Sequence, residues 1–300
     1  MTVRAVIGRL PSAPGVYRFR DAAGRALYIG RAVDLRRRVA SYWADLGDRA
    51  HLRGMVARIE RVEAVACDSE HEAAWLERNL HEHSLPYWNR TAGGQEVPVY
   101  IRLVRRSGSA RLGVVHQAST GARHFGPYLG GVKVRLAVSA LHRALPLTYA
   151  GDALGGFDRD MARVRGVESG GRDTLVATVT AALEREPEAG AALRAELERR
   201  RDRASSALAF ELAGRVQEEI EALEWVLAEQ KVTAAEPVDL DLYGWSDGVL
   251  VTFTMRGGRV RSWSQRACPH MIAPSRLALT PVAWQPFVQR NAELAARLRT

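Results

Sequence analysis

The chain has 300 residues, a formal net charge of +9 and a sequence pI near 10.1. This length allows two or three small domains, and the basic balance indicates a polyanionic partner. Lys133 and Lys231 are the only lysines, so almost every cation is a guanidinium, which binds phosphate bidentately and favours nucleic acid. The sequence has no long apolar run and no apolar stretch behind a basic N-terminus, so we predict a cytoplasmic protein without a membrane span.

Two short antiparallel strands are predicted near the N-terminus. The runs "GVYRFR" at 15–20 and "LYIG" at 27–30 are rich in aromatic and β-branched residues, and a loop containing Gly24 separates them. Pairing these runs would bring Tyr17 and Tyr28 onto one small sheet.

The pattern becomes helical from Asp34, with Leu35 and Val39 four residues apart. Arg38 and Tyr42 have the same spacing, so they are predicted to share a face of this helix. A second helix is expected over roughly 50–60, followed by a strand at 62–66.

A capping box, Ser69 with Glu72, predicts the start of a further helix, "EHEAAWLERNLHEH". Its apolar residues form one stripe, and Glu77 lies beside that stripe. Pro86 is expected to follow the end of the helix, with Asn89 shortly after it.

In this order and spacing, "PGVYRF", "LYIG", "RRRVASYW", "AAWLERNL" and "LPYWN" resemble the GIY-YIG nuclease domain of the UvrC excinuclease family. The resemblance covers residues 11 to about 103. It implies an α+β fold, with a mixed or antiparallel sheet flanked by helices over residues 1–104. Each tyrosine alone would suit ordinary strand packing, and the joint placement of the motifs favours the nuclease interpretation.

The resemblance implies roles for particular residues. Tyr17 and Tyr28 would be the two motif tyrosines, and the general base remains open between them. Arg38 and Tyr42 would hold the phosphate, Glu77 would be the only protein ligand of one Mg²⁺ or Mn²⁺ ion, and Asn89 would be a supporting polar residue. Arg31 stands where the family pattern usually has lysine, and it retains an electrostatic role because arginine stays charged.

Four arginines, Arg31, Arg36, Arg37 and Arg38, lie beside these tyrosines in the sequence. Guanidinium groups are suited to phosphate oxygens, so we predict that they contact the backbone of double-stranded, damaged DNA.

The rest of the chain resembles UvrC more thinly. We predict a UvrC-like connecting segment at 105–150, a linker with helical parts at 151–189, a UVR-like helical hairpin at 190–232 and a truncated RNase H-like or β-hairpin segment at 233–300. Where UvrC would have its cysteine cluster, residues 148–164 read "TYAGDALGGFDRDMARV". Only Cys67 and Cys268 occur in the chain, so no iron–sulfur cluster is expected.

Apolar residues at alternating spacings of four and three form a heptad seam between residues 209 and 227: Ala209, Ala213, Val216, Ile220, Leu223 and Leu227. Two interpretations are open. The seam could pack within an intramolecular hairpin, or residues 204–232 could bind UvrB, as the resemblance to the UVR motif implies. Near the C-terminus, "VLVTFTMRGGRVRSWS" predicts a β-hairpin turning at Gly257 and Gly258. After that turn Glu293 is the only acidic residue, which argues against a second, two-metal nuclease site.

The function favoured by these features is a damage- or structure-directed DNA endonuclease of nucleotide excision repair that cuts 3′ to a lesion, as a Cho-type relative would. One alternative is a catalytically silent adaptor that binds DNA or UvrB, which Arg31 and the missing cysteine cluster favour. A second is a sequence-specific GIY-YIG nuclease, although nothing after residue 104 resembles a recognition module.

Overall fold

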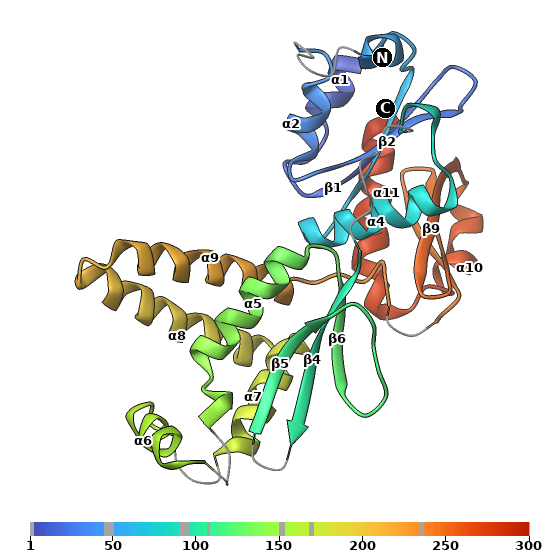
Figure 1. The fold of residues 1–300 in the computed structure, drawn as a ribbon. Helices are drawn as coiled ribbons and strands as arrows, with labels where there is room; N and C mark the ends of the chain where they lie inside the picture. Colours follow the sequence, from blue (N-terminus) through green and yellow to red (C-terminus); the bar gives the residue numbers. More distant parts are fainter. Residues whose placement is uncertain are drawn as a thin grey trace. The chain divides into compact units, whose positions relative to one another are not determined.

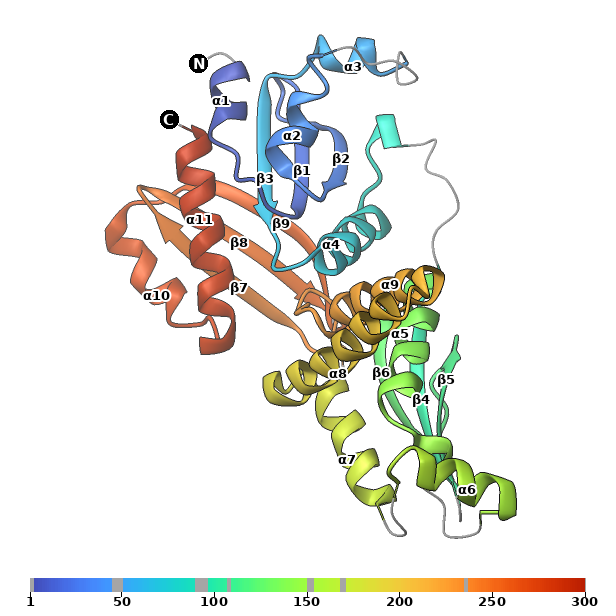
Figure 2. The ribbon, with the colours of Figure 1, turned by 90° about the vertical axis from the view of Figure 1, so that its left-hand side faces the viewer.

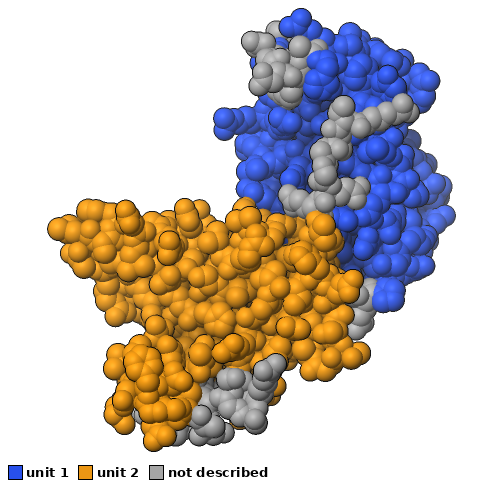
Figure 3. All heavy atoms as spheres, viewed as in Figure 1, with its two compact units in different colours: residues 1–95, 230–300 blue, residues 96–229 orange. Residues whose placement is uncertain are grey.

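The computed structural model describes residues 3–44, 51–89, 97–106, 109–149, 154–167, 171–234 and 237–299. The chain forms two compact units, one of residues 1–95 with 230–300 and the other of residues 96–229, coloured separately in Figure 3. The predicted α+β class is confirmed, with antiparallel sheets and flanking helices in both units. Across the described ranges, none of the helices combines the length and apolar character needed to cross a bilayer.

The N-terminal sheet of unit 1 has the strand order β2-β1-β3, built from Gly15–Arg20 (β1), Ala26–Ala32 (β2) and Arg61–Ala66 (β3). Both pairings are antiparallel, so β1 is central and the other two strands are edges. The predicted hairpin is confirmed, and Gly24 has the positive φ of 76° that its turn requires.

Helices surround this sheet (Figures 1 and 2). Their bounds are Val3–Gly8 (α1), Leu35–Ala40 (α2), Arg53–Val56 (α3) and Glu70–His83 (α4), with a short 3₁₀ turn at Tyr87–Asn89 (η2). The helix predicted over roughly 50–60 is only the single turn of α3, and residue 50 lies outside the described residues. Helix α4 begins where the capping box predicted, because the Ser69 hydroxyl accepts a hydrogen bond from the Glu72 backbone N–H at 3.0 Å.

The C-terminal part of unit 1 is a second antiparallel sheet, β7-β8-β9, followed by helices. Its elements are Leu240–Ser246 (β7), Val249–Arg256 (β8), Arg259–Ala267 (β9), His270–Ile272 (η4), Ala273–Leu277 (α10), Val282–Trp284 (η5) and Gln285–Arg299 (α11). The predicted turn at Gly257 and Gly258 is confirmed, since both have positive φ between the paired residues Arg256 and Arg259.

The two ends of the sequence share one core in unit 1. Leu294 and Leu298 of α11 pack into the same apolar cluster as Tyr17, Phe19 and Val39. Arg18 of β1 also joins the two sheets, because its guanidinium, which is 2.6 Å from a Glu63 oxygen within the N-terminal sheet, donates to the Trp263 carbonyl on β9 at 3.1 Å. Residues 230–300 are therefore part of the same folded body as the N-terminal sheet.

Unit 2 is a third antiparallel sheet, β5-β4-β6, with helices packed on it. The strands are Val99–Arg106 (β4), Ser109–Val115 (β5) and Arg123–Tyr128 (β6). The other elements are Gly131–Ala144 (α5), Leu147–Tyr149 (η3), Gly156–Val164 (α6), Arg172–Leu183 (α7), Pro187–Ser206 (α8) and Phe210–Leu227 (α9).

Helices occupy much of the segment 151–189, which was predicted as a linker with helical parts. Glycines adjoin both helices there, with Gly155 before α6 and Gly171 before α7, and Val176 and Val179 of α7 are buried in the core of unit 2. The predicted helical hairpin is present as α8 and α9. Its seam is buried internally at Val216, Ile220 and Leu223, whereas near the hairpin turn Ala209 is exposed and Ala213 is half-buried.

Candidate active site

The face of the N-terminal hairpin is shaped by a glycine between two tyrosines. Tyr17 lies directly opposite Gly30 in the β1–β2 pairing, and Tyr28 lies two residues before Gly30, so all three share one face. A β-carbon on Gly30 would come within 2.5 Å of the Tyr17 hydroxyl oxygen and within 2.7 Å of a Tyr28 ring carbon. Only glycine leaves room for both rings, which stack with centroids 6.2 Å apart.

Helix α2 adds an arginine to this face, and the turn after the helix adds a third tyrosine. The Tyr42 hydroxyl lies 2.7 Å from the Tyr17 hydroxyl, and both side chains are fully buried. The Arg38 guanidinium carbon is 5.7 Å from the centre of the Tyr42 ring. The predicted proximity of Arg38 and Tyr42 is therefore correct, although α2 ends at Ala40 and Tyr42 lies in the turn beyond it.

The pKa values of Tyr17, Tyr28 and Arg38 are all raised above those of the free side chains. Burial, together with the neighbouring Tyr42 hydroxyl, raises the pKa of Tyr17 well above its ordinary value. Burial also raises the pKa of Tyr28, and Arg38 opposes the rise in both cases. Burial acts to lower the pKa of Arg38, but the tyrosines outweigh it and the pKa is raised. At neutral pH Tyr17 and Tyr28 therefore keep their protons and the Arg38 guanidinium stays charged.

Glu77 reaches the hairpin from α4. One carboxylate oxygen accepts a hydrogen bond from the Arg31 backbone N–H at 3.0 Å, and the other lies 3.5 Å from the Arg31 side-chain Nε. Burial raises the pKa of Glu77, while Arg31 and His81 act to lower it. The Glu77 carboxylate is thus hydrogen-bonded to the backbone of β2 one residue after Gly30, on the edge strand that carries Tyr28.

Asn89 holds the outer side of β2. Its side-chain oxygen accepts from the Ile29 N–H at 2.9 Å, and its side-chain nitrogen donates to the Ile29 carbonyl at 2.7 Å. An edge strand leaves such backbone groups without a strand partner, and the amide of Asn89 satisfies both at once. Since Ile29 lies between Tyr28 and Gly30, Asn89 fixes the strand segment that carries the candidate site.

Comparisons with known proteins identify this arrangement. A family model described as the UvrC-like GIY-YIG domain matches residues 13–90. Residues 13–90 form a UvrC-like GIY-YIG domain. UvrABC system protein C of Geotalea daltonii is 35% identical over 145 residues, which cover 48% of this chain and 23% of that protein. The same protein of Mycobacterium sp. (strain KMS) is 33% identical over 280 residues, covering 87% of this chain and 41% of that protein.

Among solved structures, the GIY-YIG N-terminal endonuclease domain of UvrC from Thermotoga maritima, bound to its catalytic divalent cation magnesium, is 31% identical. The match covers 30% of this chain and 99% of that one, with a TM-score of 0.27. The chain spans less than half the length of the two UvrABC system C proteins.

Three of the four arginines predicted to bind DNA already have side-chain contacts in unit 1: Arg38 lies near the Tyr42 ring, and the other two are Arg31 and Arg36. Arg36 donates through Nε to the Leu10 carbonyl at 2.7 Å, and Arg31 pairs with Glu77. Arg37 is exposed, and within the described ranges its bonds are those of its backbone: its N–H donates to the Asp34 carboxylate that caps α2, and its carbonyl accepts from the Ser41 N–H. Of these side chains, Arg37 is the one with the greatest freedom to meet an external anion.

Sequence reasoning missed His81, whose charge acts on Glu77 and whose ring nitrogen lies 3.4 Å from the Ile29 carbonyl. The signal was available, because residues four apart on a helix are neighbours. It also missed the support of α4 by the C-terminal part of unit 1. The buried Asn79 donates to the Val232 carbonyl and the Thr233 hydroxyl, and the Lys231 N–H donates to Glu72.

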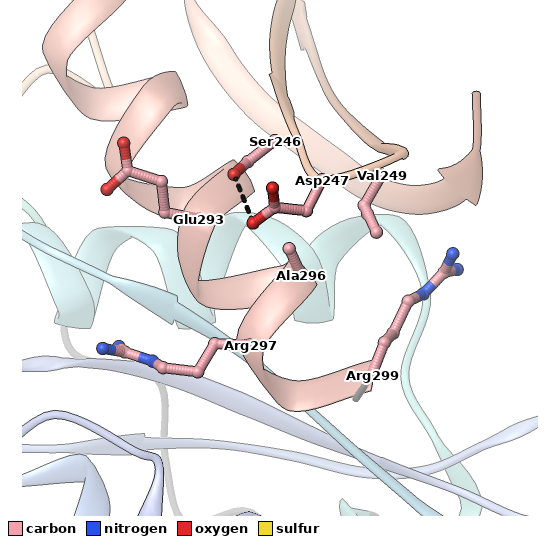
Figure 4. A pocket seen from close by; sticks show the side chains of 7 residues that line it. All are labelled: Ser246, Asp247, Val249, Glu293, Ala296, Arg297 and Arg299. Carbon is pink, nitrogen blue, oxygen red and sulfur yellow. Dashed lines mark hydrogen bonds between the residues drawn. The ribbon is translucent and has the colours of Figure 1, made fainter. Parts of the chain in front are cut away.

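A separate surface cavity of about 540 Å³ lies between the β7–β8 turn and α11 (Figure 4). Its lining residues are Ser246, Asp247, Val249, Glu293, Ala296, Arg297 and Arg299. The Ser246 hydroxyl donates to Asp247 at 3.3 Å, while the side chains of Arg297 and Arg299 diverge from the end of α11. None of the predicted site residues lines this cavity, so it is distinct from the candidate active site.

Proposed function

We propose that this chain is a metal-dependent endodeoxyribonuclease of nucleotide excision repair, which hydrolyses one phosphodiester bond on the 3′ side of a lesion. The proposal rests on one observation: six side chains meet at the edge strand β2. They come from β1, β2, α2 and the turn after it, α4 and η2. They are Tyr17, Tyr28, Arg38, Tyr42, Glu77 and Asn89. A cation, a carboxylate and hydroxyl groups at one place supply what phosphodiester hydrolysis requires.

The residues present suit one hard divalent cation such as Mg²⁺ or Mn²⁺. Carboxylate oxygen is the ligand such ions prefer, and the Glu77 side chain remains 23% exposed at the tyrosine edge. One of its oxygens has only a long 3.5 Å contact with Arg31. Glu77 would hold the ion, which when bound would stabilise the leaving alkoxide.

The chain's own groups would do the rest. Arg38, charged and half-buried, would balance the negative charge on the phosphate. Its Nε is shielded from solvent and has no hydrogen-bond partner within the described ranges, so a phosphate oxygen would complete its bonding.

Of the three tyrosines, Tyr28 is the one that is only partly buried, so we assign it the contact with the attacking water. With a raised pKa, Tyr28 would accept the proton of the water only as it passes its own proton to a phosphate oxygen of the substrate. The buried Tyr17 and Tyr42 pair would orient the Tyr28 ring rather than meet the substrate.

The test is nicking of an end-labelled duplex that carries a single bulky adduct, with Mg²⁺ or Mn²⁺, with and without UvrB. We expect a metal-dependent cut 3′ to the adduct that is lost in Glu77→Ala. Glu70→Ala is the matched control, since Glu70 is an exposed carboxylate on the same helix. A cut that survives Glu77→Ala would move the metal elsewhere, and a cut at fixed sites of undamaged plasmid would indicate a sequence-specific nuclease.

The adaptor alternative has one observation in its favour, the Arg31 guanidinium placed against the carboxylate proposed to bind metal. An adaptor would bind damaged DNA or UvrB and cut under none of these conditions. A cut restored by Arg31→Lys would instead show that arginine at this position restrains an otherwise competent site.

We further propose that the arginine-rich helix α2 contacts the DNA backbone. Because Arg36 is already bonded to the Leu10 carbonyl, Arg37 should carry most of this contact. Replacing Arg37 by alanine should reduce the slope of log duplex affinity against log salt concentration by nearly the amount that one phosphate contact contributes. An unchanged salt slope would remove α2 from the DNA face.

For UvrB, we propose the turn of the α8–α9 hairpin rather than the whole seam as the contact. The exposed apolar side chains there are Leu208, Phe210 and Leu212, whereas Ile220 is buried in unit 2. Phe210→Asp should abolish capture by UvrB and leave unfolding unchanged. Ile220→Asp should chiefly destabilise unit 2, and a loss of capture in that variant alone would contradict the assignment.

A further inference from the structure

The positive charge of the chain is concentrated in one segment. Residues 97–150 contain eight of the 43 Lys and Arg residues and no Asp or Glu, so the remaining residues together carry a net charge of only +1. This segment includes β4, β5, β6 and α5, which belong to unit 2 and not to the unit that holds the candidate active site.

One face of the sheet β5-β4-β6 is covered. Ile101, Leu103, Leu112 and Phe125 point to that side and are buried in a core shared with α5, α7 and α9. Because side chains alternate along a strand, the intervening residues point to the opposite face. Those residues are Tyr100, Arg102, Val104, Arg111, Gly113 and His124, which we call the open face.

The side chains of the open face are accessible to solvent. Arg111 is exposed, and the other five residues are only partly buried. A β-carbon added to Gly113 would meet no atom within 4 Å, so no described part of the chain lies over the middle of β5.

Other arginines of this segment are neutralised within unit 2. Arg105 pairs with Asp173, Arg123 with Glu184 and Arg143 with Glu219.

The two guanidiniums on the open face differ from these. Over the described ranges, neither Arg102 nor Arg111 forms an ion pair, and Nε of Arg102 is shielded without a hydrogen-bond partner. Arg111 lies opposite Val104, which is two residues from Arg102, so the two cations are diagonal neighbours on adjacent strands. Their charges are therefore left for an external anion.

The same face also carries aromatic rings. Arg102 lies opposite His124, and the rings of Tyr100 and His124 meet edge to face with centroids 6.5 Å apart. Rings on a sheet, next to unpaired guanidiniums, suit unstacked bases and their phosphates. A duplex offers the phosphates but keeps its bases stacked, so the rings favour a single strand.

We infer that the open face of the sheet β5-β4-β6 is a binding site for single-stranded DNA, separate from the nuclease site. The choice of DNA rests on the proposed function. Arg102 and Arg111 bind phosphates, and Tyr100 with His124 stacks against a base. The site would hold a strand displaced from the duplex while unit 1 acts on the duplex itself.

The experiment measures binding of a thymidine oligonucleotide of about 16 nucleotides to the full chain across a salt series. EDTA is present so that no cleavage occurs. Arg102→Gln combined with Arg111→Gln should reduce the salt slope by about 1.4, because each phosphate that is no longer neutralised accounts for about 0.7. Arg159→Gln combined with Arg163→Gln on α6 removes the same charge from exposed positions of the same unit and should leave the slope nearly unchanged.

Tyr100→Leu should weaken single-strand binding by about fivefold or more, with the salt slope retained, and Tyr100→Phe should restore it. Arginine variants that bind like the α6 control would overturn the inference. Equal weakening for a duplex of the same length would also overturn it, because the ligand would then be a duplex backbone. Since binding is measured without metal, the result is independent of whether the chain cuts DNA.

Discussion

The two edges of the N-terminal sheet are closed by the same device from opposite ends of the sequence. On β2, the Asn89 side chain both accepts from and donates to the backbone of Ile29. On β3, the Asn291 side chain accepts from the Ala66 N–H at 2.7 Å and donates to the Ala66 carbonyl at 3.1 Å. Both asparagines are buried, yet only the β2 edge carries Tyr28 and meets Glu77. The same bonds can therefore serve a site on one edge and the fold alone on the other.

The largest expected effect on stability comes from removing the asparagine hydrogen bonds at each sheet edge separately. Asn89→Ala and Asn291→Ala each leave a buried backbone N–H without its partner, while the carbonyl keeps a longer contact, with His81 at 3.4 Å for Ile29 and with Arg290 at 3.3 Å for Ala66. Each variant should therefore lower the free energy of unfolding by about 1–3 kcal/mol. Urea unfolding measures this change. Nicking under conditions where each variant is folded should be abolished only in Asn89→Ala, because only that residue fixes the strand between Tyr28 and Gly30. Equal loss of nicking in both variants would mean that Asn89 acts through stability alone.

Gly30→Ala tests the packing of the β2 edge from within. The added β-carbon would press on Tyr17 and Tyr28, and Tyr17 has no space to move because it is fully buried. Overpacking of this kind costs about 1–3 kcal/mol, and the displaced rings should reduce nicking further than the stability loss explains. Gly8→Ala is the control, since a β-carbon there meets no atom within 4 Å. Thermal unfolding and nicking rates that match this control would show that the tyrosine face tolerates a side chain at Gly30.

The comparison of the two edges also shows how far sequence could predict this structure. The hairpin, the start of α4 and the proximity of Arg38 to Tyr42 depend on residues close together in the chain, and each was predicted. The capping box was predicted as well, but the Glu72 carboxylate accepts from the backbone of Asp68 and of Lys231. Lys231 lies 159 residues further along the chain.

Contacts of that kind are fixed by tertiary packing and leave no periodic pattern. For the same reason Asn291 could not be told apart from any other polar residue of a C-terminal helix. Asn89 was found only because a resemblance pointed to it, not because its hydrogen bonds could be foreseen.

The pH dependence of the proposed reaction should report on the carboxylate at the β2 edge. Burial raises the pKa of Glu77, and metal binding requires the ionised form. As pH falls through this raised pKa, a proton replaces the metal, and apparent Mg²⁺ affinity should drop about tenfold per pH unit. The drop should begin above the range around 4.3 in which an ordinary glutamate takes up its proton. A Mg²⁺ titration at several pH values measures it, and a constant affinity down to that range would separate Glu77 from the metal.

The smallest effect expected concerns Arg31, which lies on the same edge. Its side chain is half exposed and lies 3.5 Å from the Glu77 oxygen, so the pair contributes at most about 1 kcal/mol. Removing it in Arg31→Ala should therefore improve apparent Mg²⁺ affinity by up to about fivefold. The Glu77 carboxylate should stay in place because the Arg31 backbone N–H still holds it.

Arg31→Lys should give an intermediate metal affinity, since an ammonium retains the charge and loses the planar fork. Arg25→Ala is the control, because Arg25 is an exposed arginine in the hairpin loop just before β2, paired with Asp21 and not with Glu77. If Arg31→Ala weakens Mg²⁺ binding instead, the guanidinium supports the metal site through the substrate phosphate or the shape of the edge. Arginine at this position would then be part of the active site and not a restraint on it.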